Sequence, residues 1–407
     1  LNSSFRWGVF IFFKKMKKSS TTKTIRNIHL WLGLSIGLLV FIISITGAIY
    51  AFQEEITNAL REQAIYNTET NIDGKKTLSI AELEKKVDAF TNEKYPIHWV
   101  NIANNKNINY VFYYYERDDH AWNYFDEYII YKSVYVNPFT GEIEGVYDEK
   151  NSFFNIVKFI HWSFLLKGEW GTYVVGIPTL IFLIMIITGI ILWWPKNKKA
   201  RKQRFWFQWK NVKNWRRKNY DLHSIVGFYA SFIALISAIT GLFYAFFFVQ
   251  ALLYFTFSGG ETTIPNFDQY KTTASPESRN EHTLDKISAK VEETYPDAYG
   301  YAIDLGHEHH DDHEHPNFSV FIKQLSYSYH KNHSIIFDEN SGEMLHNYSH
   351  DEKNLGEKFV AANYDIHVGS ILGIWGKILA FIGSLVCASL PITGFMVWWG
   401  RKNKNKI

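Results

Sequence analysis

The chain has 407 residues, a formal net charge of +3 and a single cysteine, Cys387. One cysteine excludes an internal disulfide, a CxxC redox motif and a thiolate metal cluster. The mean hydropathy of −0.17 is typical of a soluble protein. That average hides four apolar runs, each as long as the ~20 helical residues that cross a bilayer. We therefore expect an α-helical membrane protein with four transmembrane helices.

The predicted elements alternate between apolar and polar stretches. In chain order, we expect a basic N-terminal segment (1–27), a first membrane helix (28–59), a first polar domain (60–152), an interfacial segment with the second membrane helix (153–195), a basic loop (196–220), a third membrane helix (221–257), a second polar domain (258–360), a fourth membrane helix (361–400) and a short tail (401–407). Residues 1–15 are expected either to precede a natural start at Met16 or to form an interfacial helix, and no cleavable signal peptide is assigned.

Basic residues without acidic ones flank the apolar runs. Residues 5–26 carry seven Lys or Arg, and residues 195–219 carry eleven, with no acid in either stretch. Short basic flanks stay in the cytoplasm, so we expect both termini and the middle loop inside and the two long polar domains outside. The basic loop also fits a nucleic-acid patch, but topology and anionic lipid headgroups explain it fully. No nucleic-acid partner is therefore predicted.

The two polar domains follow one plan, which predicts two small α+β domains. The first has a helical pattern at 78–90, strand patterns at 97–103, 109–116 and 129–137, and a turn at 137–142 that leads into a short strand. The second has a helix at 284–294, strands at 299–305, 318–325 and 333–338, and a turn at 339–343. Two such domains facing one another would form a cleft, and the first is dense in Trp and Tyr.

The apolar runs repeat in two matched pairs, which indicates a tandem duplication. In the first pair, His29 and His223 stand at the start of a run, and a Thr-Gly pair follows 17 residues later. In the second pair, His161 and His367 precede a Thr-Gly pair and then two tryptophans. His29 and His223 fall at the inner ends of their helices, and His161 and His367 at the outer ends. One pair of histidines is thus expected at each membrane face.

Paired intramembrane histidines predict two b-type haems. Each haem needs two axial imidazoles from facing helices, an apolar slot and small residues where the ring nears the backbone. Gly47 and Gly241 are expected at the depth of the outer histidines, and Gly189 and Gly394 at the depth of the inner ones. A lone His at a helix end is usually an interfacial residue, and a Thr-Gly pair usually serves only helix packing. The prediction of haem therefore depends on the joint pattern of the histidines and glycines. Four basic residues near the faces are interpreted first as topology or interface charges, although each could meet a haem carboxylate: Lys23, Arg26, Lys158 and Lys167.

Several motifs resemble the PepSY-associated transmembrane-helix family, among them IRNIHLWLGL, FIHWSFLLKGEWG and TGIILWWPK. The resemblance covers nearly the whole chain after Met16. It implies a bacterial inner-membrane ferric-siderophore reductase that holds two haems on His29, His161, His223 and His367. A quinol or a cytoplasmic flavoprotein would donate electrons, and a ferric siderophore or another iron chelate would accept them outside.

Two alternatives stay open. The family's domain name also implies a non-enzymatic, membrane-anchored module that binds or inhibits a peptidase. A metal sensor or transporter is the other alternative, because an exported tract departs from the family pattern with the histidines His307, His309, His310, His313 and His315. Such a tract suits Zn, Cu, Ni or Fe, but a solvated loop that binds metal adventitiously is favoured. No nucleotide-binding fingerprint is present.

Overall fold

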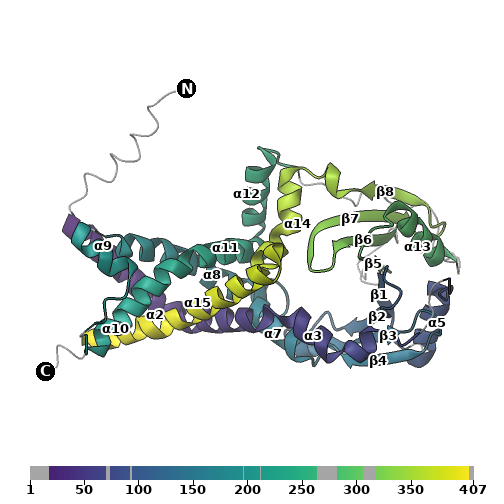
Figure 1. Cartoon of the computed structure of the whole chain (residues 1–407), viewed down its shortest axis with the longest axis horizontal. Coiled ribbons are helices and arrows are strands. Elements are labelled where there is room, and N and C mark those ends of the chain that lie inside the picture. The colour runs from purple at the N-terminus through teal and green to yellow at the C-terminus, as the bar shows by residue number, and fades with distance from the viewer. Residues whose placement is uncertain are drawn as a thin grey trace.

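A computed structural model describes residues 18–69, 74–91, 94–195, 197–210, 212–263, 282–305 and 317–402. The molecule is elongated, with a helical bundle at one end and a sheet at the other (Figure 1). Residues 1–17 and the His-rich tract, with its five candidate metal ligands His307, His309, His310, His313 and His315, lie outside the described residues.

Four helices are long and apolar enough to span a membrane, as predicted. The spans are Thr21–Tyr50, Gly168–Trp193, Trp215–Ala245 and Ser370–Lys402. They belong to α2 (Lys18–Tyr50), α8 (Gly168–Trp193), α11 (Gly227–Ala245) with α10 (Trp215–Asp221) and the π-turn η1 (Leu222–Val226), and α15 (Gly373–Lys402) with the 3₁₀ turn η3 (Ser370–Leu372). Helix α2 packs on α8 and α15, and α11 packs on the same two.

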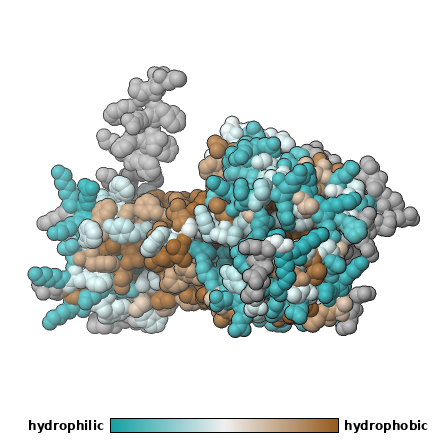
Figure 2. Space-filling model, turned by 45° about the vertical axis from the view of Figure 1, so that its right-hand side comes forward, coloured by the Kyte–Doolittle hydropathy of each residue, from teal (hydrophilic) through white to brown (hydrophobic). Residues whose placement is uncertain are grey.

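The lateral surface of the bundle is apolar. Side chains such as Leu38 (71% exposed) and Phe232 (60% exposed) point away from the protein. A hydrophobic band crosses the molecule between two hydrophilic ends (Figure 2). An apolar lateral surface on helices long enough to cross a bilayer is typical of a membrane protein. The basic helix α9 (Lys198–Phe205) and α10 lie at the end of the bundle remote from the sheet (Figure 1).

The membrane helices are interrupted where the sequence predicted continuous ones. The segment expected as one helix over 28–59 breaks after Tyr50 and resumes as α3 (Gln53–Leu60), followed by α4 (Glu62–Ile65). The segment 221–257 breaks at Phe246, whose extended backbone separates α11 from α12 (Phe247–Ser258). Hydropathy does not reveal the break at Phe246, because apolar residues continue through it, whereas the break after Tyr50 coincides with the polar residues Gln53, Glu54 and Glu55.

Both histidines predicted at the outer face lie on short helices that precede the spans. Helix α7 (Phe153–Ser163) ends in two left-handed residues, Phe164 and Leu165, before α8 begins. Helix α14 (Leu355–Val368) ends at Gly369, with φ of 85°. A Cβ atom there would lie 2.3 Å from the Gly376 carbonyl oxygen, so this close turn requires glycine.

The expected strands are confirmed, but they form one sheet and not two separate domains. Eight antiparallel strands run in the order β4-β3-β2-β1-β5-β6-β7-β8. Their bounds are β1 (Ile97–Ala103), β2 (Tyr110–Arg117), β3 (Tyr128–Val136), β4 (Ile143–Asp148), β5 (Gly300–Asp304), β6 (Asn317–Leu325), β7 (Ser328–Asp338) and β8 (Met344–Tyr348). The short helices α6 (Tyr124–Glu127) and η2 (His350–Glu352) complete this region.

The expectation of two domains facing across a cleft is therefore corrected. Strands β1 and β5 pair in antiparallel register, with Val100 opposite Ile303. Each would otherwise be an edge strand with unpaired backbone groups, and pairing removes both edges. Helices α5 (Ile80–Thr91) and α13 (Thr283–Thr294) join the strands of both halves in one buried core.

Candidate functional site

The structure brings the four predicted histidines together in the two predicted pairs. His29 on α2 and His223 in η1 form the basic-side pair, with ring centroids 6.5 Å apart and ring planes at 82°. His161 on α7 and His367 on α14 form the sheet-side pair, with centroids 6.0 Å apart and planes at 54°. Each pair draws one histidine from each half of the chain.

Each imidazole also contacts the threonine of a Thr-Gly pair on a neighbouring helix. Every one of these threonine hydroxyls donates to a carbonyl of its own helix, so its oxygen is free to accept from the ring. For His161 the Nδ1 atom also lies 2.8 Å from the Ile43 carbonyl oxygen, which can only accept. Nδ1 therefore carries the proton. The Nδ1 to Oγ distances are 2.9 Å for His29 and Thr188, 2.9 Å for His223 and Thr393, 2.9 Å for His367 and Thr240, and 3.3 Å for His161 and Thr46.

The four predicted glycines lie directly against the four rings. A Cβ atom built on Gly47 would lie 2.9 Å from Cε1 of His161, and one on Gly241 would lie 3.3 Å from Cε1 of His367. On the basic side, Gly189 faces His29 at 3.4 Å and Gly394 faces His223 at 3.2 Å. The glycines make room for the imidazoles, whereas the sequence had suggested room for the porphyrin. At Gly47 the Nε2 atom is farther away, at 3.8 Å, than Nδ1 at 3.3 Å.

Sequence reasoning missed a repeated Asn-Tyr-Asp motif before both histidines of the second half. Asn219 donates to the Thr393 carbonyl (3.0 Å) and Asn363 to the Thr240 carbonyl (3.1 Å). Each asparagine therefore fixes the same threonine that contacts the histidine four residues later. The signal was present in the sequence, as Asn-Tyr-Asp-Leu-His at 219–223 and Asn-Tyr-Asp-Ile-His at 363–367. The π-turn that carries His223 had no such signal.

A cavity of about 380 Å³ surrounds the sheet-side pair. This volume falls within the range of about 300–1,000 Å³ that small-molecule sites occupy. Its walls are mostly small or apolar residues from α2, α8, α11 and α15, including Ser44, Ala234 and Gly383. His161, His367 and the glycines that face them, Gly47 and Gly241, all line it. The region therefore offers an apolar slot with two neutral imidazoles.

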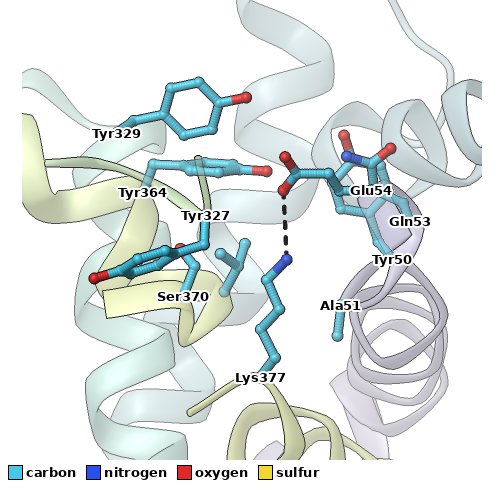
Figure 3. A pocket seen from close by; sticks show the side chains of 10 residues that line it. Tyr50, Ala51, Gln53, Glu54, Tyr327, Tyr329, Tyr364, Ser370 and Lys377 are labelled. Carbon is cyan, nitrogen blue, oxygen red and sulfur yellow. Dashed lines mark hydrogen bonds and ion pairs between the residues drawn. The ribbon is translucent and has the colours of Figure 1, made fainter. Parts of the chain in front are cut away.

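A polar pocket adjoins this cavity on the side of the sheet. Lys377 lies 2.7 Å from Glu55 and 3.4 Å from Glu54, and Lys323 of β6 lies 3.8 Å from Glu54. Figure 3 shows three tyrosines, from α14 and the β6–β7 hairpin, beside the Glu54–Lys377 pair. Tyr50 and Tyr364 line both the pocket and the cavity, and Tyr327, Tyr329 and Ser370 line the pocket.

An aromatic network connects the sheet to the helix that carries His161. The rings of Trp99 and Tyr113 are 5.1 Å apart, and further contacts lead through Tyr128 to Phe159 of α7, at 5.9 Å. The aromatic residues that the sequence showed in the first polar domain therefore pack with each other and with α7.

A family model described as the PepSY-associated TM region matches residues 26–401. No curated protein matches the chain. The match contains the basic-side and sheet-side pairs and all four spans except residues 21–25 of the first and residue 402 of the last. The chain belongs to the PepSY-associated transmembrane family.

Proposed function

We propose that the protein carries electrons across a membrane through two bis-histidine haems and reduces a ferric siderophore or another ferric chelate on the side of the sheet. The observation that carries this proposal is the pairing of the four histidines, each with Nδ1 within 3.3 Å of a threonine hydroxyl. A proton on Nδ1 leaves the Nε2 lone pair for a metal. Burying four imidazole rings in an apolar bundle costs free energy, so such residues are usually functional.

The spacing within each pair fits axial ligation of one iron. Metal–imidazole bonds are about 2 Å long, so two imidazoles on opposite sides of one ion have ring centres about 6.3 Å apart. The measured separations are 6.5 Å and 6.0 Å. The threonines set the tautomer and orientation of each ring, which is the usual role of the partner of a ligating histidine.

The number of ligands favours haem over a bare metal ion. Each pair supplies two nitrogens, which is what an axial pair on haem requires. Protein zinc sites use three or four protein ligands. Within the part of the chain that the structure describes, no group of three or more His, Cys, Asp or Glu side chains gathers as a metal site.

The two pairs lie in separate layers of the bundle. His161 contacts Thr46, which is 17 residues after His29 on α2, so the layers are about 26 Å apart along the helix. A haem bound at each layer would accept and donate one electron at a time. The chain's own residues hold the two sites in register and exclude water from the apolar space between them, where Ile186, Ala238 and Cys387 are buried.

The sheet side is the proposed place of chelate reduction. Ferrous iron binds hard oxygen chelators much less tightly than ferric iron does, so reduction would release the metal. The basic side, with α9 and α10, would receive electrons from a quinol or an acidic cytoplasmic donor. If the positive-inside rule holds here, the termini are cytoplasmic and the membrane is the bacterial inner membrane.

The test is the visible spectrum of the purified protein and its response to a ferric chelate. We expect Soret and α bands that sharpen with dithionite and return to the oxidised form when ferric chelate is added under anaerobic conditions. His161→Ala should abolish this reoxidation, with half of the haem kept. A stably folded, colourless protein from haem-supplied cells would overturn the proposal and would favour a peptidase-binding module.

A further inference from the structure

Lys158 lies three residues before His161, on the same face of α7, and lines the sheet-side cavity. Residues three apart on a helix are neighbours, so the ammonium group and the imidazole belong to one site. The lysine is only partly exposed, although α7 lies outside the four candidate spans. Burial lowers the pKa of Lys158 to about 8.

Among the described residues, no acidic side chain forms an ion pair with this lysine, and Glu149 acts on it only from a distance. Its nearest aromatic contact is the Phe159 ring, 4.8 Å from Nζ. The carboxylate that acts on it, Glu149, is already held by Arg61 at 2.5 Å and 3.1 Å and by Ser133 at 2.6 Å. A buried cation normally has a partner of opposite charge. The missing partner is therefore expected in the cavity.

The equivalent position before each of the four histidines has a regular pattern. Arg26 and Lys158 stand three residues before the histidines of the first half, and Tyr220 and Tyr364 before those of the second. Each pair thus combines one basic residue and one tyrosine. Tyr364 lines the sheet-side cavity together with Lys158. Burial raises the pKa of the Tyr364 phenol, which keeps it a hydrogen-bond donor.

We propose that Lys158 is the anion-binding residue of the sheet-side site and pairs with a carboxylate of the cofactor bound between His161 and His367. This proposal rests on the proposed function and adds to it the orientation of the cofactor: its anionic edge faces α7 and the sheet, and its apolar edge faces the interior of the bundle. Lys158 is a positioning residue, because it does not ligate the metal.

The experiment is a spectroelectrochemical titration of the full-length protein in lipid nanodiscs. A nearby cation favours the reduced state, so Lys158→Met should lower the midpoint of one of two haem components. We expect at least a tenfold change in its reduction equilibrium, which is about 59 mV for one electron. The affected component should be the one that His367→Ala removes. Lys158→Arg should restore the midpoint.

Lys167→Met is the matched control. Lys167 follows the same helix and carries the same charge, but it bonds the Asp118 carbonyl at 2.8 Å and pairs with Asp119 at 3.7 Å. Its loss should leave both midpoints unchanged. An unchanged content of the haem bound by the basic-side pair would show that each variant is correctly folded.

Three outcomes would overturn the inference. If Lys158→Met titrates like the wild type while two haems are present, Lys158 does not face the cofactor and the proposed function still stands. If the midpoint shift occurs only in nanodiscs with anionic lipid, a lipid phosphate is the partner. A wild-type protein without haem would instead refute the proposed function itself, and the role of Lys158 with it.

Discussion

At each histidine, one threonine hydroxyl determines which ring nitrogen is free. Thr240 donates to the carbonyl of Ile236 and accepts from Nδ1 of His367. Replacing this hydroxyl by a methyl group removes the side-chain acceptor of Nδ1. The threonine thus positions the imidazole ring of a histidine on a neighbouring helix.

Thr240→Val should weaken haem binding at the sheet-side pair by about 10–100-fold, the usual cost of losing the partner of a ligating histidine. The basic-side pair should keep its haem. Haem titration into the cofactor-depleted protein measures both affinities. Thr179→Val is the control, because Thr179 lines the same cavity and donates to Val175 of its own helix. Equal affinities for Thr240→Val and Thr179→Val would contradict the role of the hydroxyl.

The four glycines should tolerate alanine to different degrees. Gly47→Ala brings a methyl group within 2.9 Å of the His161 ring, whereas Gly189→Ala reaches 3.4 Å from His29, an ordinary contact. We expect Gly47→Ala to lose most of one haem and Gly189→Ala to keep both. Absorbance of the purified variants measures the haem content.

Gly37→Ala controls for the helix itself, because it lies on α2 with its nearest contact at 3.4 Å. Alanine is favoured over glycine in a helix by about 1 kcal/mol, so this variant should be at least as stable as the wild type. A Gly47→Ala protein with full haem content would show that the ring can move aside.

The sequence predicted the histidines and glycines but not the function of the threonines. A histidine at each apolar run is a strong signal because polar residues are rare there. The sequence also placed Gly47 at the depth of the outer histidines, by counting 1.5 Å per residue. It could not show that Thr46 bonds His161, because that contact depends on the rotation of two helices about their axes.

At the scale of elements, Asp365 joins the sheet to the helix that carries His367. It is fully buried and accepts from the backbone N–H groups of Tyr329 and His330 at 2.7 Å and 2.6 Å, and from Ser370 Oγ at 2.5 Å. The β6–β7 hairpin is therefore attached to α14 two residues before the histidine. Asp221 has a similar position before His223, where it accepts from Arg217 and Trp209.

Asp365→Asn should weaken the attachment of the hairpin, because the amide oxygen that replaces Oδ2 carries no charge and the amide nitrogen cannot accept from Ser370. Each hydrogen bond to a charged group contributes about 1.5–3 kcal/mol, so we expect lower thermal stability and faster amide exchange at residues 327–330. Asp351→Asn, at an exposed position, is the control. Unchanged exchange at the hairpin would contradict the attachment.

Helix breaks were the elements that the sequence predicted least well. Five of the six predicted strands matched within one residue at each end, because alternating polar and apolar residues have a clear period, whereas β7 begins at Ser328, five residues before the predicted start. The break at Phe246 has no adjacent glycine or proline that marks it, whereas Gly168, three residues after the left-handed Leu165, is a local signal for a bend between His161 and the second span. In the folded chain the Phe246 ring packs against Gly176 and Tyr173 of α8, and the Leu165 carbonyl accepts from the Tyr124 N–H.

At the scale of the whole molecule, the two polar regions fold as one unit. Strands β1 and β5 pair, and Asp285 of α13 accepts from the Ile80 N–H at the start of α5. Sequence periodicity predicted each half, but pairing between halves depends on edges that have no pattern of their own. The tandem duplication remains an inference from the repeated motifs.

Gly300→Ala should weaken this junction, since its Cβ would lie 2.6 Å from the Ile102 carbonyl oxygen. A backbone carbonyl cannot move aside without breaking the β1–β5 ladder. We expect hydrogen exchange of the backbone amides to become faster in both β1 and β5. Protection that falls in β5 alone would indicate two independent domains.

The haem content of the purified wild-type chain tests the central claim most directly. A pyridine haemochrome assay combined with quantitative amino-acid analysis should give two b-type haems per chain. It should give one haem per chain when His223 or His367 is replaced by alanine, because each pair holds one iron. A wild-type ratio of zero or one, or a ratio that either replacement leaves at two, would contradict it.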